Sequence, residues 1–192
     1  MNKGRALISF VFLLAALTFS LAQRKEDEVL SIPDQENIKN LSSKWHSGYF
    51  NVTRYKKLHY IFIDSLNKPE TDPIIIIFNG GPGGASTFLA FYLIGPYTIS
   101  STSKNLTDFP VTWARNASLL FIDNPAGVGF SYAQREVDWI SNDVSNNKDL
   151  LNFLFQFYSF WPSRTSNPLY IFGVSYGGMY APMLAWGIHN SN

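Results

Sequence analysis

The chain has 192 residues, of which 46% are hydrophobic and only 15% charged, and its formal net charge is +1. This composition is typical of a globular domain with a sizeable core and excludes a disordered protein. The lack of cysteine excludes disulfides, thiolate zinc sites and a cysteine nucleophile, and the charge offers no basic patch for a nucleic acid. The three histidines, His46, His59 and His189, have no metal-ligand spacing, so we expect them to be ordinary surface or strand residues and expect no metal site.

Residues 1–22 have the pattern of a cleaved secretory signal peptide. Lys3 and Arg5 precede a mostly apolar run, and Ser20-Leu21-Ala22 offers a cleavage site before Gln23. The alternative is a membrane anchor, but the apolar run is short for a span of about 20 residues, and charged residues follow it at once. We therefore expect a signal peptide over 1–22, a mature domain over 23–192 and no membrane attachment after cleavage.

A secretory route gives meaning to the N-glycosylation sequons of the chain, which begin at Asn40, Asn51, Asn105 and Asn116. The alternative is chance matching in a sequence rich in asparagine. The final compartment would be the extracellular space, a lysosome or a vacuole.

The first strands are expected at Trp45–Val52 and Lys57–Asp64, as an antiparallel pair at a sheet edge. Ile74–Phe78 is a continuous apolar run without polar alternation, which predicts a central strand buried on both faces. A glycine-rich loop follows it at 79–84, where backbone N–H groups can approach a ligand closely. A phosphate-binding P-loop is the rival interpretation, but the loop lacks the terminal Lys-Ser/Thr of that motif.

Helices and strands alternate through the rest of the chain. We expect a short helix over 85–94, a polar connection over 97–110, a strand over 118–123, an amphipathic helix over 143–161 and a strand over 169–172. This alternation predicts an α/β fold, with a largely parallel sheet and helices on both faces.

The segment Gly173-Val174-Ser175-Tyr176-Gly177 is a G-x-S-x-G pentapeptide between the last predicted strand and a helix-forming stretch over 178–186. A strand, a sharp turn and a helix are the context of a nucleophile elbow, in which Ser175 is exposed and the N–H of Tyr176 faces a developing oxyanion. A plain glycine-rich turn is the alternative.

Three motifs occur in one order: Asn79-Gly80-Gly81-Pro82-Gly83, the loop 124–132, and the pentapeptide with Gly178. Together with Ser47-Gly48-Tyr49 they make the chain from about residue 29 to 192 resemble the serine carboxypeptidases, which are α/β-hydrolases. The resemblance implies that Ser175 is the acylating nucleophile and that Gly81 and Tyr176 supply the oxyanion N–H groups. It also implies that Asn79 and Gly80 help to hold the C-terminal carboxylate of a peptide or protein substrate, without a cofactor.

The chain departs from the family pattern at several positions. Ala85 stands where the family has a disulfide cysteine, and Val174 and Leu93 stand where it has glutamates that assist carboxylate recognition. In α/β-hydrolases the triad acid and histidine follow the serine, whereas only 17 residues follow Ser175 and they contain no Asp or Glu. His189 is expected at the end of a helix rather than on a loop. The chain is therefore interpreted as the N-terminal part of such a hydrolase, with the C-terminal part missing.

Three hypotheses follow for the function. The first is a serine carboxypeptidase represented by its N-terminal part. The second is a secreted non-catalytic homologue that acts as a binding module. The third is an esterase or acyltransferase on the same scaffold.

Overall fold

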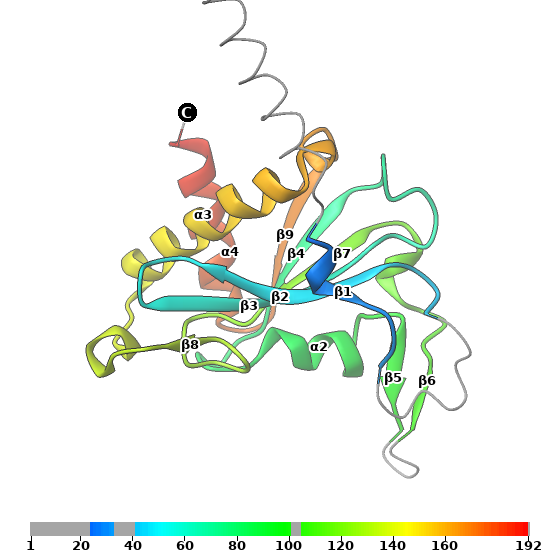
Figure 1. Ribbon diagram of the computed structural model, residues 1–192, viewed down its shortest axis with the longest axis horizontal. Helices are drawn as coiled ribbons and strands as arrows, with labels where there is room; N and C mark the ends of the chain where they lie inside the picture. Colours follow the sequence, from blue (N-terminus) through cyan, green and yellow to red (C-terminus); the bar gives the residue numbers. More distant parts are fainter. Residues whose placement is uncertain (1–23, 33–40, 101–104, 192) are drawn as a thin grey trace, which may run out of the picture.

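The structure is a computed structural model that describes residues 24–32, 41–100 and 105–191. The predicted signal peptide at 1–22 and the sequon at Asn40 lie outside these residues. A single large sheet forms the centre of the fold, with α3 and α4 over one face and α2 over the other (Figure 1). No helix within the described ranges has the length and hydropathy needed to cross a bilayer.

Among the described residues the sheet has seven strands; six follow the order β1-β2-β3-β7-β4-β9, and the seventh, β8, pairs with the start of β3. The strands are β1 (Glu28–Val29), β2 (Trp45–Asn51), β3 (Lys56–Ile63), β4 (Ile74–Phe78), β7 (Ser118–Ile122), β8 (Tyr132–Ala133) and β9 (Leu169–Gly173). Strands β7, β4 and β9 are parallel, whereas β1, β2 and β3 are antiparallel to their neighbours. The expected antiparallel pair is thus confirmed as β2 and β3. In the described part of the chain, the two-residue β1 lies between β2 and the edge of the sheet.

Strand β4 lies between β7 and β9, so the prediction of a central strand is confirmed. Ile76 is opposite Leu120 on one side and Ile171 on the other. Four of the five side chains of β4 are fully buried, because helices cover both faces of the sheet there. The three parallel strands end at the same edge, and the loops that carry the sequence motifs follow them.

The helices are α2 (Ser86–Tyr92), α3 (Asp143–Phe160) and α4 (Gly177–His189), with short 3-10 turns η1 (Lys25–Asp27), η2 (Trp113–Arg115), η3 (Glu136–Trp139) and η4 (Pro162–Arg164). A reciprocal capping box between Asn142 and Ser145 fixes the start of α3. Phe153 and Phe157 of α3 pack against aromatic side chains of β2 and β3 and form the core on that face. Helix α4 extends beyond the predicted end at residue 186.

The segment 97–110 differs from the expected polar connection. It contains a small antiparallel hairpin of β5 (Tyr97–Ile99) and β6 (Leu106–Asp108). Tyr97 and Leu106 are almost fully buried in the core on the α2 face, where the Tyr97 ring stacks on Trp45. The apolar residues of this segment are separated by polar ones that face solvent, so the sequence reads as polar although one face of the hairpin is buried.

Candidate active site

Ser175 lies on a sharp turn between β9 and α4, as the pentapeptide predicts. Its φ is 54°, and it is the only residue other than glycine with a positive φ in the described part of the chain. A non-glycine residue in this region costs about 1–3 kcal/mol, and such strain is concentrated at functional positions. The turn persists because Gly177 N–H bonds Val174 O at 2.8 Å and Gly178 N–H bonds Ser175 O at 2.9 Å. Ser175 is exposed at the carboxyl edge of the sheet.

The glycines around this turn are required by close contact between backbones. A Cβ on Gly173 would lie 2.0 Å from the carbonyl oxygen of Gly177. The predicted role of these glycines in letting strand and helix approach one another therefore matches the geometry.

The loop after β4 packs directly against the elbow. A Cβ on Gly80 would lie 2.6 Å from the Cβ of Ser175 and 2.9 Å from the backbone nitrogen of Tyr176. Within the described residues, no hydrogen bond occupies the N–H of Gly81 or that of Tyr176. Two sequence motifs 95 residues apart (80 to 175) thus meet beside one serine, and both offer free N–H donors there.

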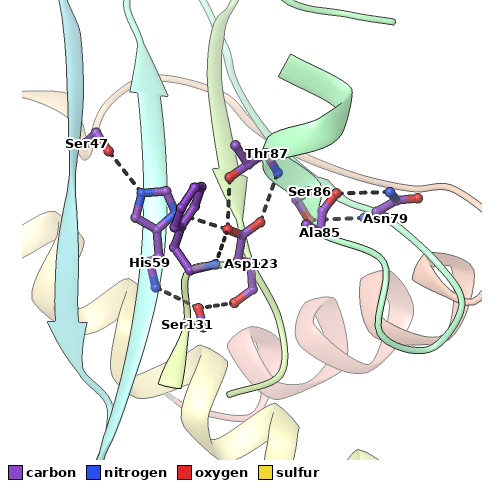
Figure 2. A network of polar contacts seen from close by, with 9 residues as sticks. Ser47, His59, Asn79, Ala85, Ser86, Thr87, Asp123 and Ser131 are labelled. Carbon is purple, nitrogen blue, oxygen red and sulfur yellow. Dashed lines mark hydrogen bonds and ion pairs between the residues drawn. The ribbon is translucent and has the colours of Figure 1, made fainter. Parts of the chain in front are cut away.

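Asn79 is fixed by the start of α2 (Figure 2). Its N–H donates to Ser86 Oγ at 3.1 Å, and its side-chain Nδ2 donates to the carbonyl of Ala85 at 3.0 Å. Its Oδ1 accepts the N–H of Gly80 at 2.8 Å. Asn79 and Gly80, which the resemblance assigns to the substrate carboxylate, are therefore bonded to each other here. One hydrogen on Nδ2 remains for a ligand.

A second polar cluster, which the sequence analysis did not identify, lies beside the start of α2, on β2, on β3 and directly after β7 (Figure 2). His59 Nδ1 is 3.0 Å from a carboxylate oxygen of Asp123, and His59 Nε2 is 2.9 Å from Ser47 Oγ. His59 and Asp123 are buried, whereas Ser47 is half-buried in the middle of β2. The expectation that His59 is an ordinary strand residue holds for its position but misses these contacts.

Asp123 also organises the loop 124–131. It accepts the N–H of Phe130, and Ser131 Oγ bridges the backbone of His59 and Asp123. Burial by itself would raise the pKa of Asp123, but hydrogen bonds from His59, Thr87 and Phe130 outweigh it and lower the pKa below its usual value. The carboxylate is therefore ionised at neutral pH and fully enclosed by donors.

On the other side of the elbow, the Tyr176 hydroxyl lies 3.2 Å from a carboxylate oxygen of Asp143. The negative charge of Asp143, followed by partial desolvation, raises the pKa of Tyr176. A cavity of about 280 Å³ opens beside this pair, lined by Pro82, Pro125, Ser141, Asn142, Asp143, Asn146, Tyr176 and Tyr180. Hollow space therefore lies next to the residue that follows the candidate nucleophile.

Three other residues that the sequence analysis discussed, Val174, Leu93 and His189, lie in different surroundings. Val174 packs into the core on the α2 face, and Leu93 is 54% exposed just after α2. His189 ends α4, about 18 Å along the helix from Gly177 at 1.5 Å per residue, so it cannot serve as the base for Ser175. No described histidine or carboxylate hydrogen-bonds Ser175.

Comparison with known proteins agrees with this geometry. The sequence model of the serine carboxypeptidase family matches residues 33–192. A serine carboxypeptidase of Dictyostelium discoideum is 40% identical over 76% of this chain and 35% of its own length. The lysosomal protective protein of Mus musculus is 34% identical over 90% of this chain and 37% of its own length.

Among solved structures, Kex1, a prohormone-processing carboxypeptidase of Saccharomyces cerevisiae, superposes with a TM-score of 0.76 and 25% identity. The match covers 88% of this chain and 40% of Kex1. The chain thus spans well under half the length of these relatives. With the family sequence model, the ordered motifs and the α/β-hydrolase fold in agreement, the chain belongs to the serine carboxypeptidase family.

Proposed function

We propose that this chain carries the nucleophile and the oxyanion hole of a serine carboxypeptidase, which hydrolyses the C-terminal peptide bond of its substrate. The observation that supports this most is the exposed Ser175 on a strained elbow, with the Gly80–Gly81 loop packed against it. Ser175 Oγ attacks the carbonyl carbon of the terminal peptide bond. The developing oxyanion is held by the N–H groups of Gly81 and Tyr176, which are free of other partners.

The attack requires a base to accept the serine proton. In α/β-hydrolases the histidine and its acid come after the nucleophile in sequence, and no described residue fills either role at Ser175. With that histidine in place, the proton passes to the leaving amine, the C–N bond breaks and the shortened peptide remains as an acyl-enzyme. Water then attacks the ester and releases the acid, regenerating Ser175.

Asn79 and Gly80 are proposed to recognise the free carboxylate of the substrate. Support comes from their place next to Ser175 and from the Nδ2 hydrogen that no described residue uses. The Gly80 N–H donates to Asn79 Oδ1, so it can bind a substrate carboxylate only if this hydrogen bond breaks or becomes bifurcated between the two acceptors. Val174 and Leu93 offer no hydrogen bond to this carboxylate, so its recognition is expected to be weaker than with the two family glutamates.

The proposal includes passage through the secretory pathway, toward the extracellular space, a lysosome or a vacuole. Besides the N-terminal sequence pattern, support comes from the similarity to a mouse protein named as lysosomal. Asn51 and Asn116 are exposed, as glycan acceptors must be. A peptide or protein C-terminus is the proposed partner.

The test is peptide hydrolysis by the complete protein. Peptides with a free C-terminal carboxylate and the same peptides as C-terminal amides are compared from pH 4 to pH 8, with a Ser175→Ala variant. We expect release of the C-terminal amino acid from the free acids, and a loss of kcat/KM of at least about ten-thousandfold in the variant. Peptide binding without hydrolysis would indicate a binding module, and hydrolysis of a matched C-terminal ester without hydrolysis of the peptides would indicate an esterase.

A further inference from the structure

The buried Asp123 carboxylate joins three parts of the fold that are separate in sequence. It accepts hydrogen bonds from His59 Nδ1 on β3 at 3.0 Å and from Phe130 N–H in the loop after β7 at 3.2 Å. It also accepts the N–H and the Oγ1–H of Thr87, each at 2.9 Å, in the first turn of α2. Asp123 is 0% exposed, so these four donors are the whole environment of its charge.

The Thr87 contact replaces a cap that α2 lacks. The N-cap residue of α2 is Ala85, whose side chain cannot accept a hydrogen bond from the first turn. The free N–H groups of that turn need an acceptor, and negative charge is favoured at this end of a helix. Asp123 supplies both, from a strand 36 residues away in the sequence.

From this turn a series of contacts leads to Ser175, and Figure 2 shows the part of it from Asp123 to Asn79. The residues just before Thr87, Ala85 and Ser86, hold the side chain and backbone of Asn79. Asn79 in turn holds the N–H of Gly80. Gly80 touches Ser175 so closely that a single added carbon would collide with it.

We infer that Asp123 is a positioning residue: through Thr87 and Asn79 it holds the Gly80–Gly81 loop at the distance from Ser175 that an oxyanion hole requires. This inference rests on the proposed function. Hydrogen bonds to an ionised acceptor are the stronger ones, and an enclosed carboxylate cannot exchange them for water. Oxyanion stabilisation depends on donors fixed before the reaction, so a loosened loop lowers kcat, and KM rises by a smaller factor because Asn79 and Gly80 of the same loop are proposed to hold the substrate carboxylate.

Thr87→Val tests the inference in the complete protein, because it removes one donor to Asp123 and keeps the shape and the backbone N–H of residue 87. We expect kcat to fall about tenfold, KM to rise by a smaller factor, and amide hydrogen exchange over 79–84 to become faster. Thr87→Ser keeps the hydroxyl and should restore both values. Thr71→Val, at an exposed threonine between β3 and β4, is the matched control and should change neither.

Asp123→Asn is the second variant, with an expected loss in kcat of about a hundredfold, since an amide cannot accept from all four donors. Unchanged kcat and unchanged exchange in Thr87→Val would overturn the inference, and so would equal losses in Thr87→Val and Thr87→Ser. If the complete protein hydrolyses no peptide, the proposed function fails instead. In that case amide hydrogen exchange over residues 79–84 tests the positioning role by itself. Faster exchange in Thr87→Val would support the role, and unchanged exchange would refute it.

Discussion

Ser47 and Ser175 present opposite halves of a catalytic serine site. Ser47 has a histidine at 2.9 Å, and that histidine has an aspartate at 3.0 Å, so the order of partners is that of a triad. Ser47 nevertheless lies half-buried within the regular strand β2. Ser175 has no described histidine or carboxylate partner, but it is exposed on a strained turn beside free N–H donors.

The difference shows which features mark a nucleophile in this fold. Partner distances of about 3 Å occur in any satisfied buried network, because polar groups in a core must find partners. A strained serine beside free N–H donors gains no stability from that arrangement, and it is the arrangement that nucleophilic catalysis needs. We therefore propose that Ser175 is the reactive serine and that the Asp123 network has a positioning role, and the predictions below test that division.

The largest expected effect is selective labelling of the two serines. A fluorophosphonate probe applied to the complete protein should modify Ser175, and peptide mass spectrometry should find no modified Ser47. The probe mimics the tetrahedral intermediate, so it needs oxyanion donors as well as an activated hydroxyl. Ser175→Ala should reduce labelling to background. Label on Ser47 in that variant would show that the buried network activates a hydroxyl after all.

A smaller but still large effect is expected at Gly80. In Gly80→Ala the new methyl group must displace the loop or the elbow, because its nearest neighbours are the Ser175 Cβ and the Val174 and Tyr176 backbone. A misplacement of about 1 Å costs about a hundredfold in rate, so we expect that loss in kcat/KM. Circular dichroism should show that the variant folds.

Gly178→Ala is the matched control for this change, since a Cβ there would meet no atom within 4 Å. It should leave kcat/KM unchanged and, being inside α4, should stabilise the helix slightly. Equal losses in both variants would mean that glycine content, rather than contact with Ser175, matters at this turn.

Asp123 should also make stability depend on pH. The pKa of Asp123 is lowered in the folded state, so the ionised carboxylate stabilises the fold. This contribution is complete above the unfolded pKa of about 3.9. It is lost as the pH falls through the lower folded pKa. We expect Asp123→Asn to reduce the free energy of unfolding at pH 7 by about 2 kcal/mol, through the loss of charge-assisted hydrogen bonds. In urea titrations of the complete protein, the difference from wild type should shrink below about pH 4. A difference that stays constant to pH 2 would contradict this sign.

Local patterns were enough to predict the longer strands (β2, β3, β4, β7 and β9), the elbow and the two-faced layering. The run Ile74–Phe78 and the pentapeptide at Ser175 each encode their structure within a few residues. Membership of the family also followed from motif order. The roles of Ser175, Gly81, Tyr176, Asn79 and Gly80 remain proposals.

The Asp123 network could not be predicted in the same way. His59 and Asp123 are 64 residues apart, and no spacing between them signals contact. From the sequence, the one role to consider for Asp123 was that of the triad acid. Asp123 comes before Ser175, whereas the acid of an α/β-hydrolase comes after the nucleophile. One signal was present, because Asp123 directly follows the apolar run Ser118–Ile122, whose side chains are all buried. A carboxylate that is buried with such a strand needs hydrogen-bond donors around it. The β5–β6 hairpin was missed because its strands are only three residues long.

The smallest expected effect belongs to Ser47→Ala, and it separates the two halves of the comparison most directly. The variant removes the hydroxyl from His59 Nε2 but leaves the bond between His59 and Asp123 and the four donors around that carboxylate. Because Ser47 is only half-buried, water can reach the freed nitrogen, and the cost in unfolding free energy should be about 1 kcal/mol or less. The kcat of the complete protein should stay within about twofold of wild type, since neither Thr87 nor the Gly80–Gly81 loop loses a contact. A loss in kcat as large as that of Asp123→Asn would mean that Ser47, His59 and Asp123 act together in catalysis, and the assignment of a positioning role to Asp123 alone would be wrong.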